Sequence, residues 1–285
     1  MKTIAMKNYQ TVERRLGARP AFTITELLVV IAIIGILAAL LLPVLAKAKV
    51  SAQKKQAAVE ISQIVGAIQQ YDSVYGRFPV SAAAQNQAAQ NAQAGLNPDF
   101  TYGGVFQTPT GPNPPIGTLV NGSILTNAEV IAILMDLTNY PNSSLTVNTN
   151  HQKNPQRTIF LNAKMSGYDP ASNDLLPPGG VDITGVYRDP WGNPYVISMD
   201  LNYDEQCQDA FYSLQSVSQT VSSSQTGING LFNPNSSNPN SDNFLYHGKV
   251  MVWSAGPDGK IDPTSLPSGG SANSGVNKDN VLSWQ

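Results

Sequence analysis

An uncharged, mostly apolar run extends from Leu27 to Ala46 near the start of the chain. At about 1.5 Å per residue, a helix of this length is about 30 Å long, which matches the hydrocarbon core of a bilayer. A helix buried in a globular domain is rarely apolar on all sides over such a length. Three interpretations fit the run. It is a cleaved secretory signal with Ala46-Lys47-Ala48 as its cleavage site, a plain signal anchor, or an anchor whose residues 1–21 are removed on the cytoplasmic side.

Beyond Pro43 the pattern becomes amphipathic. Apolar residues recur in steps of three and four, which places them on one face of a helix. Gly76 ends this helix, and Pro79 prevents it from resuming. The pattern therefore predicts one helix over residues 22–75, membrane-spanning over 22–46 and amphipathic over 47–75. The apolar stripe consists of Ala57, Ile61, Ile64, Ile68, Tyr71 and Tyr75.

The rest of the chain, residues 76–285, is predicted to form a head built from short elements. A helix is expected over Thr126–Leu137, with Thr126 as its N-cap and Glu129 completing a capping box. Strands bounded by turn residues are expected at 158–162, 194–199 and 248–253. The expected buried face of the helix consists of Val130, Ile131, Leu134 and Leu137.

Two regions of low complexity interrupt the head. The region near 81–120 begins with an Ala/Gln/Asn stretch and continues with Gly, Pro and Thr, and the region near 200–243 is rich in Ser, Asn, Gln and Pro. Both are expected to be loop insertions outside the core. The predicted fold class is α+β, with a long N-terminal helix packed on a small antiparallel β-sheet.

Charge is sparse and unevenly placed. Charged residues make up 13% of the chain, a composition that favours an exported protein over a cytosolic enzyme. Residues 1–21 carry a net charge of +4, so the remaining residues carry −6 of the total of −2. A basic leader before an acidic body favours a cytoplasmic N-terminus and argues against nucleic-acid binding. Four lysines at positions 47–55 oppose this simple count.

The chain offers few residues for catalysis. Cys207 is the only cysteine, so no intramolecular disulfide can form, and the fold must be held by packing or by an ion. We expect Cys207 to be an inert packed residue. Neither His151 nor His247 has an evident partner in the sequence, and no nucleophile–base arrangement stands out. An enzyme is therefore not expected.

Glu26 stands directly before the apolar run, where a carboxylate near lipid is costly. If the chain is cut between Ala21 and Phe22, Phe22 gains a free α-amine one helical turn from Glu26. Glu26 can then pair with its own amine or with that of a neighbouring copy. In an apolar helix bundle, this pairing offsets the desolvation of the carboxylate. The position of Glu26 thus favours a cleaved anchor that packs against copies of itself.

Residues 22–38, FTITELLVVIAIIGILA, resemble the prepilin processing and assembly segment shared by type IV pilins and type II secretion pseudopilins. The resemblance implies that a prepilin peptidase cuts between Ala21 and Phe22 and N-methylates Phe22, although the family prefers Gly where Ala21 stands. It implies that Glu26 is an assembly contact and that the helix forms a filament core. Gly35 and Pro43 bracket a stretch similar to one that melts on assembly, or Pro43 only marks the membrane exit.

The segment Asp189-Pro190-Trp191-Gly192-Asn193-Pro194, followed by Tyr195, combines the residues of a tight turn with a large aromatic side chain that needs cover. It resembles the turn that opens the small sheet of the major pseudopilin of type II secretion systems. The resemblance implies a structural role for this turn.

The C-terminal segment 253–259, WSAGPDG, together with Lys278-Asp279-Asn280-Val281 and Trp284, resembles the calcium-binding loop of the same family. The resemblance implies Asp258 and Asp279 as ligands for Ca²⁺, and Asp262 is an additional acid nearby. Calcium takes about six to eight oxygen ligands, and the spacing is not that of an EF-hand. Alternatively, Asp258-Gly259 is a simple hairpin turn.

The leading hypothesis is a pseudopilin, a structural filament subunit that polymerises through its N-terminal helix to support protein export by a type II secretion-like system. The expected partners are other copies of itself, minor pseudopilins, the inner-membrane assembly platform, the prepilin peptidase/methyltransferase and membrane lipid. The expected location is the bacterial inner membrane, crossed once, with a periplasmic head assembled into a pseudopilus. The alternatives are a type IV pilin-like subunit for adhesion, motility or DNA uptake and, less favoured, a membrane-anchored enzyme or binding module.

Overall fold

The computed structural model describes residues 23–109, 111, 113–172, 177–264 and 271–284. The chain divides into two compact units, Met1–Ala48 and Lys49–Gln285. The predicted leader and the predicted cleavage site between Ala21 and Phe22 lie outside the described residues.

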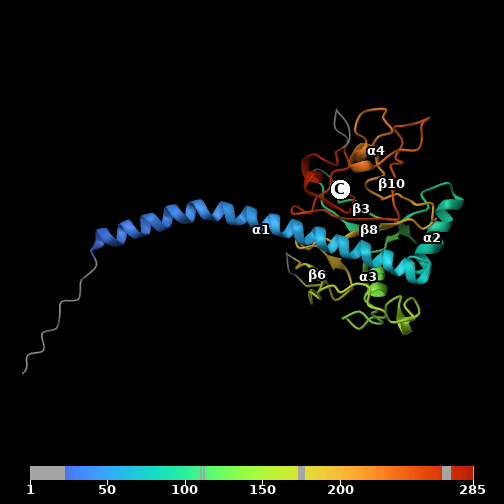
Figure 1. Cartoon of the computed structure of the whole chain (residues 1–285), viewed down its shortest axis with the longest axis horizontal. Coiled ribbons are helices and arrows are strands. Elements are labelled where there is room, and N and C mark those ends of the chain that lie inside the picture. The colour runs from blue at the N-terminus through green and yellow to red at the C-terminus, as the bar shows by residue number, and fades with distance from the viewer. Residues whose placement is uncertain (1–22, 110, 112, 173–176, 265–270, 285) are drawn as a thin grey trace, which may run out of the picture. The chain divides into compact units, whose positions relative to one another are not determined.

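Helix α1 (Ile24–Tyr75) is 52 residues long and contains Pro43 in its interior (Figure 1). This confirms the prediction of one long N-terminal helix with an apolar first part. Every side chain from Thr23 to Ala52 is exposed. By length and composition the helix is a candidate membrane span, a criterion that a signal sequence also meets.

The C-terminal part of α1 buries one face, as the periodicity predicts. All members of the predicted stripe are buried except Tyr75, which is partly buried. Burying each isoleucine of this stripe contributes about 1.5–3 kcal/mol. The amphipathic half of the helix is therefore a structural part of the head.

A four-stranded antiparallel sheet lies at the centre of the head, with the strand order β1-β8-β11-β12. The register pairs Ile197 with Val252 and Val196 with Trp253. Successive residues of a strand face opposite sides of the sheet. Accordingly, Ile197 and Val252 pack in the cluster that contains α1, whereas Val196 and Trp253 pack in a second cluster. The sheet thus separates two hydrophobic cores. Its strands are β1 (Phe100–Tyr102), β8 (Val196–Met199), β11 (Val250–Ser254) and β12 (Val281–Leu282).

Strands β8 and β11 confirm the strands predicted at 194–199 and 248–253. The remaining strands form short antiparallel pairs around the central sheet. These pairs are β2 (Gly104–Val105) with β3 (Pro115–Ile116), β4 (Leu119–Val120) with β5 (Ser123–Ile124), β6 (Gly180–Val181) with β7 (Tyr187–Arg188), and β9 (Gln206–Cys207) with β10 (Tyr246–His247). The other helices are α2 (Ala82–Gln93), α3 (Ala128–Leu134) and α4 (Gln215–Ser218), with 3₁₀ turns at Thr149–His151, Ile228–Gly230 and Gly275–Asp279.

The prediction of a loop over 81–98 was wrong, because this stretch contains helix α2. Alanine and glutamine are good helix formers. Ser81 caps the helix by accepting a hydrogen bond from the amide of Ala84 at 3.2 Å. Ala84 and Ala88 are buried, so the helix adds to the head instead of leaving it.

Helix α3 is shorter than predicted and is not capped by Thr126. It begins after Asn127, which makes no cap bond. The Asn127 side chain instead donates to the carbonyls of Tyr187 and Tyr195 at 2.9 and 2.8 Å. Residues 130–134 are all buried, on every side of the helix, because α3 lies within the core. The prediction of a single buried face therefore underestimated the burial of α3.

Two other expectations for the head were wrong. Residues 158–162 form no strand, because the amides of Phe160 and Leu161 both donate to the carbonyl of Leu134 at 2.9 and 3.1 Å. The region 200–243 is not outside the core, since Val217 and Leu231 are buried in the second cluster. Its side-chain amides hold it in place, with Gln219 Nε2 donating to three oxygens at 3.0–3.1 Å.

Candidate functional site

The start of α1 is stabilised by a reciprocal pair of hydrogen bonds between Thr23 and Glu26. The Thr23 amide donates to Glu26 Oε2 at 2.9 Å, and the Glu26 amide donates to Thr23 Oγ1 at 3.2 Å. This is a capping box, which satisfies two amides that have no partner within the helix. The Thr-x-x-Glu pattern is visible in the sequence, but the sequence analysis missed this use of it. Glu26 therefore has a role within its own chain, and the pairing with the amine of Phe22 stays a prediction.

Gly35 and Pro43 both lie in the exposed part of α1. A Cβ atom added to Gly35 would meet no atom within 4 Å. The fold of the single chain therefore gives no steric reason for a glycine there. The helix continues through Pro43 to Tyr75.

The predicted turn at 189–194 is built around the buried carboxylate of Asp189. Asp189 Oδ1 accepts from the amides of Trp191 and Asn193, both at 2.9 Å. Asp189 Oδ2 accepts from Asn193 Nδ2 at 3.1 Å and from Ser254 Oγ at 2.5 Å. Gly192 has φ +94°, and a Cβ there would lie 2.3 Å from the Pro177 carbonyl. Glycine is therefore required at this turn position.

This turn connects α1 to the C-terminal loop. Gln53 Nε2 of α1 donates to the carbonyl of Pro190 at 3.1 Å. Asn193 Nδ2 donates to the carbonyl of Gly256 at 3.0 Å. Burial raises the pKa of Asp189 to about 6, despite the hydrogen bonds that favour its charged form. The predicted structural role of the turn fits these contacts.

The three predicted calcium ligands are not equally placed. Asp262 Oδ1 accepts from the amide and the hydroxyl of Thr264 at 2.9 and 2.6 Å, and the Asp262 carbonyl accepts from Asn277 Nδ2 at 2.7 Å. Burial raises the pKa of Asp279, and the nearby charge of Asp258 raises it further. Asp258 Oδ1 likewise accepts from an amide two residues on, that of Lys260, at 2.9 Å, so Asp258 and Asp262 both make local turn contacts, and Asp258 also lies near enough to affect Asp279.

Two buried oxygens near the chain end have no hydrogen-bond partner, Asp279 Oδ1 and Asn280 Oδ1. Buried polar atoms rarely stay unpaired, so these oxygens are available to a cation. Within the described part of the chain, however, no three His, Cys, Asp or Glu side chains are grouped closely enough to hold a metal ion. The residues therefore fit a calcium ion only if amide and carbonyl oxygens supply most of the ligands.

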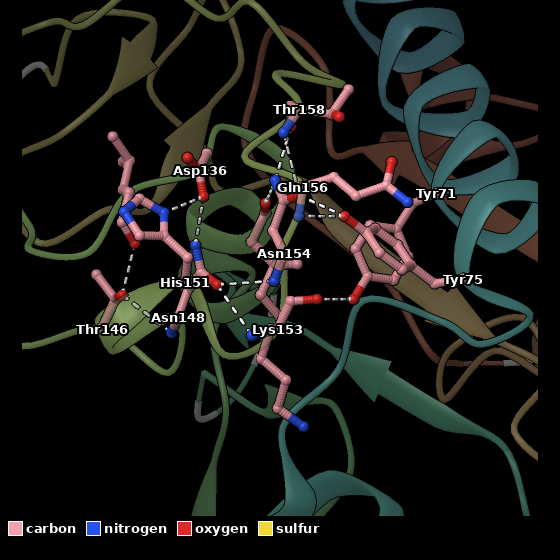
Figure 2. Close-up of polar contacts among 12 residues, drawn as sticks. Tyr71, Tyr75, Asp136, Thr146, Asn148, His151, Lys153, Asn154, Gln156 and Thr158 are labelled. Carbon is pink, nitrogen blue, oxygen red and sulfur yellow. Dashed lines mark hydrogen bonds and ion pairs between the residues drawn. The ribbon is translucent and has the colours of Figure 1, made fainter.

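A polar network that the sequence analysis missed joins the end of α1 to the segment after α3 (Figure 2). Tyr75 donates to Asn154 Oδ1 at 2.7 Å, and Tyr71 donates to the carbonyl of Lys153 at 2.5 Å. The buried Asn154 also donates to the carbonyl of Thr158 at 2.7 Å. These contacts bridge about 80 residues of sequence, with separations of 79 for Tyr75 and 82 for Tyr71. In the sequence, only the hydroxyl groups of Tyr71 and Tyr75 within the apolar stripe could have suggested these contacts.

His151 has an acidic partner that was not evident in the sequence, whereas His247 contacts an aromatic ring. His151 Nδ1 lies 2.8 Å from Asp136 Oδ1, and Asn148 Nδ2 donates to the same oxygen at 3.0 Å (Figure 2). His247 stacks on Phe232 with ring centroids 4.0 Å apart. Asp136 and His151 both have φ +56°, a conformation that is strained for their side chains.

Asp99 is a further buried acid that sequence reasoning did not single out. Its Oδ2 accepts from the amide of Gln208 at 2.7 Å, whereas its Oδ1 has no partner. Burial raises the pKa of Asp99 to about 8, with smaller contributions from Asp200 and Asp204. At neutral pH this carboxyl is therefore mostly protonated.

Cys207 is buried, as expected, and burial raises the pKa of its thiol well above the ordinary value. A thiol in such surroundings is a poor nucleophile.

Comparison of the chain with protein-family models, with curated proteins and with solved structures finds no match.

Proposed function

We propose that the chain is a structural filament subunit, a pseudopilin of a type II secretion-like system that assembles through its N-terminal helix to support protein export. The observation that carries the proposal is the apolar half of α1, in which every side chain from Thr23 to Ala52 is exposed. Exposing apolar surface to water costs about 25 cal/mol per Å². Lipid before assembly and neighbouring helices after it are the environments that remove this cost.

The two ends of α1 support different tasks. The first part presents an uncharged surface from Leu27 to Ala46, which includes Gly35, where an added Cβ would meet no atom within 4 Å. Small residues allow the backbones of neighbouring helices to approach closely. The second part is fixed in the head through its apolar stripe, through Gln53 and through the two tyrosines near its end. The helix thus joins a segment that packs in the filament to a segment that belongs to the head.

Glu26 has a second task under this proposal. The capping box needs only an acceptor oxygen, but assembly needs the negative charge, because the charge pairs with the α-amine released when the chain is cut before Phe22. The prepilin peptidase, an inner-membrane assembly platform and minor pseudopilins are the partners that this proposal requires. Nucleic acid is not among them, and the head is placed in the periplasm.

Glu26→Gln separates the two tasks of this residue. Glutamine keeps an acceptor oxygen for the Thr23 amide but carries no charge, so the cap survives and the pairing is lost. We expect Glu26→Gln and Glu26→Ala to be cleaved normally and to be absent from purified filaments, whereas Thr25→Ala behaves as wild type. If Glu26→Gln assembles as well as wild type, Glu26 is only a helix cap and the assembly role is refuted.

We also propose that Asp258 and Asp279 take part in binding Ca²⁺, supported by the two unpartnered oxygens of Asp279 and Asn280. An ion there would neutralise the carboxylates and tie down the C-terminal segment of a chain that has no disulfide. Thermal melting of the full chain in calcium and in EGTA tests this. We expect EGTA to lower the midpoint for wild type and to leave Asp279→Asn unchanged, with the exposed Asp169→Asn as control. Equal midpoints for wild type in both buffers would remove calcium from the account.

A further inference from the structure

A cavity of about 350 Å³ opens between helix α2 and the loop that follows β8. Its size lies at the lower end of the range of about 300–1,000 Å³ that is usual for small-molecule sites. Three alanines of α2, Ala88, Ala89 and Ala92, form one side, and Leu201, Asn202 and Tyr203 of the loop form another. The lining contains no charged residue. A charged ligand would find no counter-charge among these residues.

Tyr203 lines the cavity with a strained, left-handed backbone conformation. Its backbone has φ +60°, which is unfavourable for a bulky residue, and the strain requires support from the surrounding loop. Asp200 provides this support by accepting from the amides of Asp204 and Glu205 at 3.3 and 2.8 Å. The Tyr203 ring stacks on the buried Phe78 with centroids 5.4 Å apart, yet 49% of the residue stays exposed. One ring face is thus fixed on the core, and the residue still presents an aromatic surface to a ligand.

The polar groups of the lining are amides with free hydrogen-bonding capacity. Among the described residues, the Gln85 side chain forms no hydrogen bond, which leaves both its NH₂ and its carbonyl oxygen for a ligand. Asn202 donates to Asp204 Oδ2 at 2.9 Å, so its own carbonyl oxygen can still accept. Side-chain amides both donate and accept, which matches the hydroxyl groups of a sugar. A purely apolar ligand would not use this hydrogen-bonding capacity.

We propose that this cavity binds a neutral saccharide, a mono- or disaccharide unit that places the C–H face of its ring on Tyr203 and its hydroxyls on Gln85 and Asn202. An aromatic face carries partial negative charge and attracts the weakly positive C–H groups of a pyranose ring. The absence of charge in the lining selects neutral over acidic sugars. This inference stands apart from filament assembly, because every residue it uses lies in the head.

Saturation-transfer NMR on the full chain tests the proposal, with maltose, cellobiose, lactose and N,N′-diacetylchitobiose as probes. The chain is kept in a detergent without a sugar headgroup, because a glucoside or maltoside detergent would compete for the cavity. We expect wild type to transfer magnetisation to at least one of these disaccharides with weak, millimolar affinity. No transfer to any of the four would overturn the proposal.

Variants locate the binding. Tyr203→Gly removes the ring and at the same time relieves the strained backbone, so the head is expected to fold. Glu205→Gly is the matched control, because Glu205 has φ +64° in the same loop but does not line the cavity. We expect Tyr203→Gly, and independently Gln85→Ala, to weaken binding by about tenfold or more, and Glu205→Gly to bind as wild type. Unchanged binding by both cavity variants would refute the site.

Discussion

Asp99 allows a direct test of how burial controls the stability of the head. Asp99 is 3% exposed, and its Oδ1 lies buried without a partner. Replacing it with asparagine keeps the shape of the side chain and an acceptor for the Gln208 amide, but removes the titrating proton. The variant therefore removes the cost of burying a charged carboxylate without changing the packing around the side chain.

The magnitude follows from the pKa of Asp99, which is about 8 in the folded chain against an ordinary value of 3.8. Because the folded pKa is raised, the stability associated with the protonated group is fully present below pH 3.8 and is lost as the pH rises through 8. Each pKa unit corresponds to about 1.4 kcal/mol, so the whole loss is roughly 6 kcal/mol, of which roughly 2 kcal/mol falls between pH 6 and 8. Asp189 acts with the same sign, but its pKa of about 6 confines its effect to lower pH.

Urea unfolding of the full chain, followed by tryptophan fluorescence from pH 5 to 8, measures this dependence. All three tryptophans lie in the head, so the signal reports on the head alone. We expect wild type to lose stability steadily from pH 6 to 8 and Asp99→Asn to lose far less. The asparagine side chain leaves a buried amide unpaired, which costs about 1–3 kcal/mol. With this cost subtracted, the variant should be more stable than wild type at pH 8 by roughly 2–4 kcal/mol. The exposed Asp169→Asn is the control and should keep the wild-type slope. A wild-type stability that is flat or rises over this range would refute the reasoning.

The packing and hydrogen bonds of the head give three further predictions. Ile64→Ala should destabilise the head by about 2–5 kcal/mol through the cavity it leaves. Val59→Ala, on the exposed face of the same helix, should change stability by less than about 0.5 kcal/mol. Equal effects of the two variants in urea unfolding would contradict the assignment of the buried face. Asn154→Ala removes the acceptor of the Tyr75 hydroxyl and should lower the free energy of unfolding by roughly 3 kcal/mol. Tyr75→Phe should lower it by only about 1 kcal/mol. The reverse order would show that the network is not centred on Asn154. Ser81→Ala should cost about 1 kcal/mol through loss of the α2 cap, and hydrogen exchange of the α2 amides measures it; unchanged protection would argue against the cap.

The apolar patterns of the chain predicted what depends on local periodicity. The stripe from Ala57 to Tyr71 marked the buried face of α1, because a helix that packs on a core must repeat apolar residues every three or four positions. The same reasoning did not predict helix α2, because its buried residues are alanines surrounded by Gln and Asn, and this composition suggested a low-complexity loop. The length of α3 was also not predicted, because Asp136, inside the predicted helix, has φ +56°, so the helix ends at Leu134.

The candidate sites divide in the same way. The turn around Asp189 could be predicted, since its prolines, glycine and asparagine specify a local geometry. Its attachment to Gln53 and Gly256 could not, because these contacts join segments 137 and 63 residues away. The protonation of Asp99 and the exposed wall formed by Tyr203 likewise depend on which distant segments surround each side chain. Long-range contacts of this kind leave no periodic signal in a sequence.

The central claim is that this chain is a filament subunit cut before its apolar helix, and the intact mass of the chain extracted from membranes tests it most directly. We predict a mass that corresponds to residues 22–285 with one added methyl group on Phe22. Top-down fragmentation should locate that methyl group on the N-terminal residue. A chain that starts at Lys49 would mean ordinary signal-peptide removal, and one that keeps its leader would mean a plain anchor. Either result would contradict the account, because both leave Glu26 without the amine that its assembly role requires.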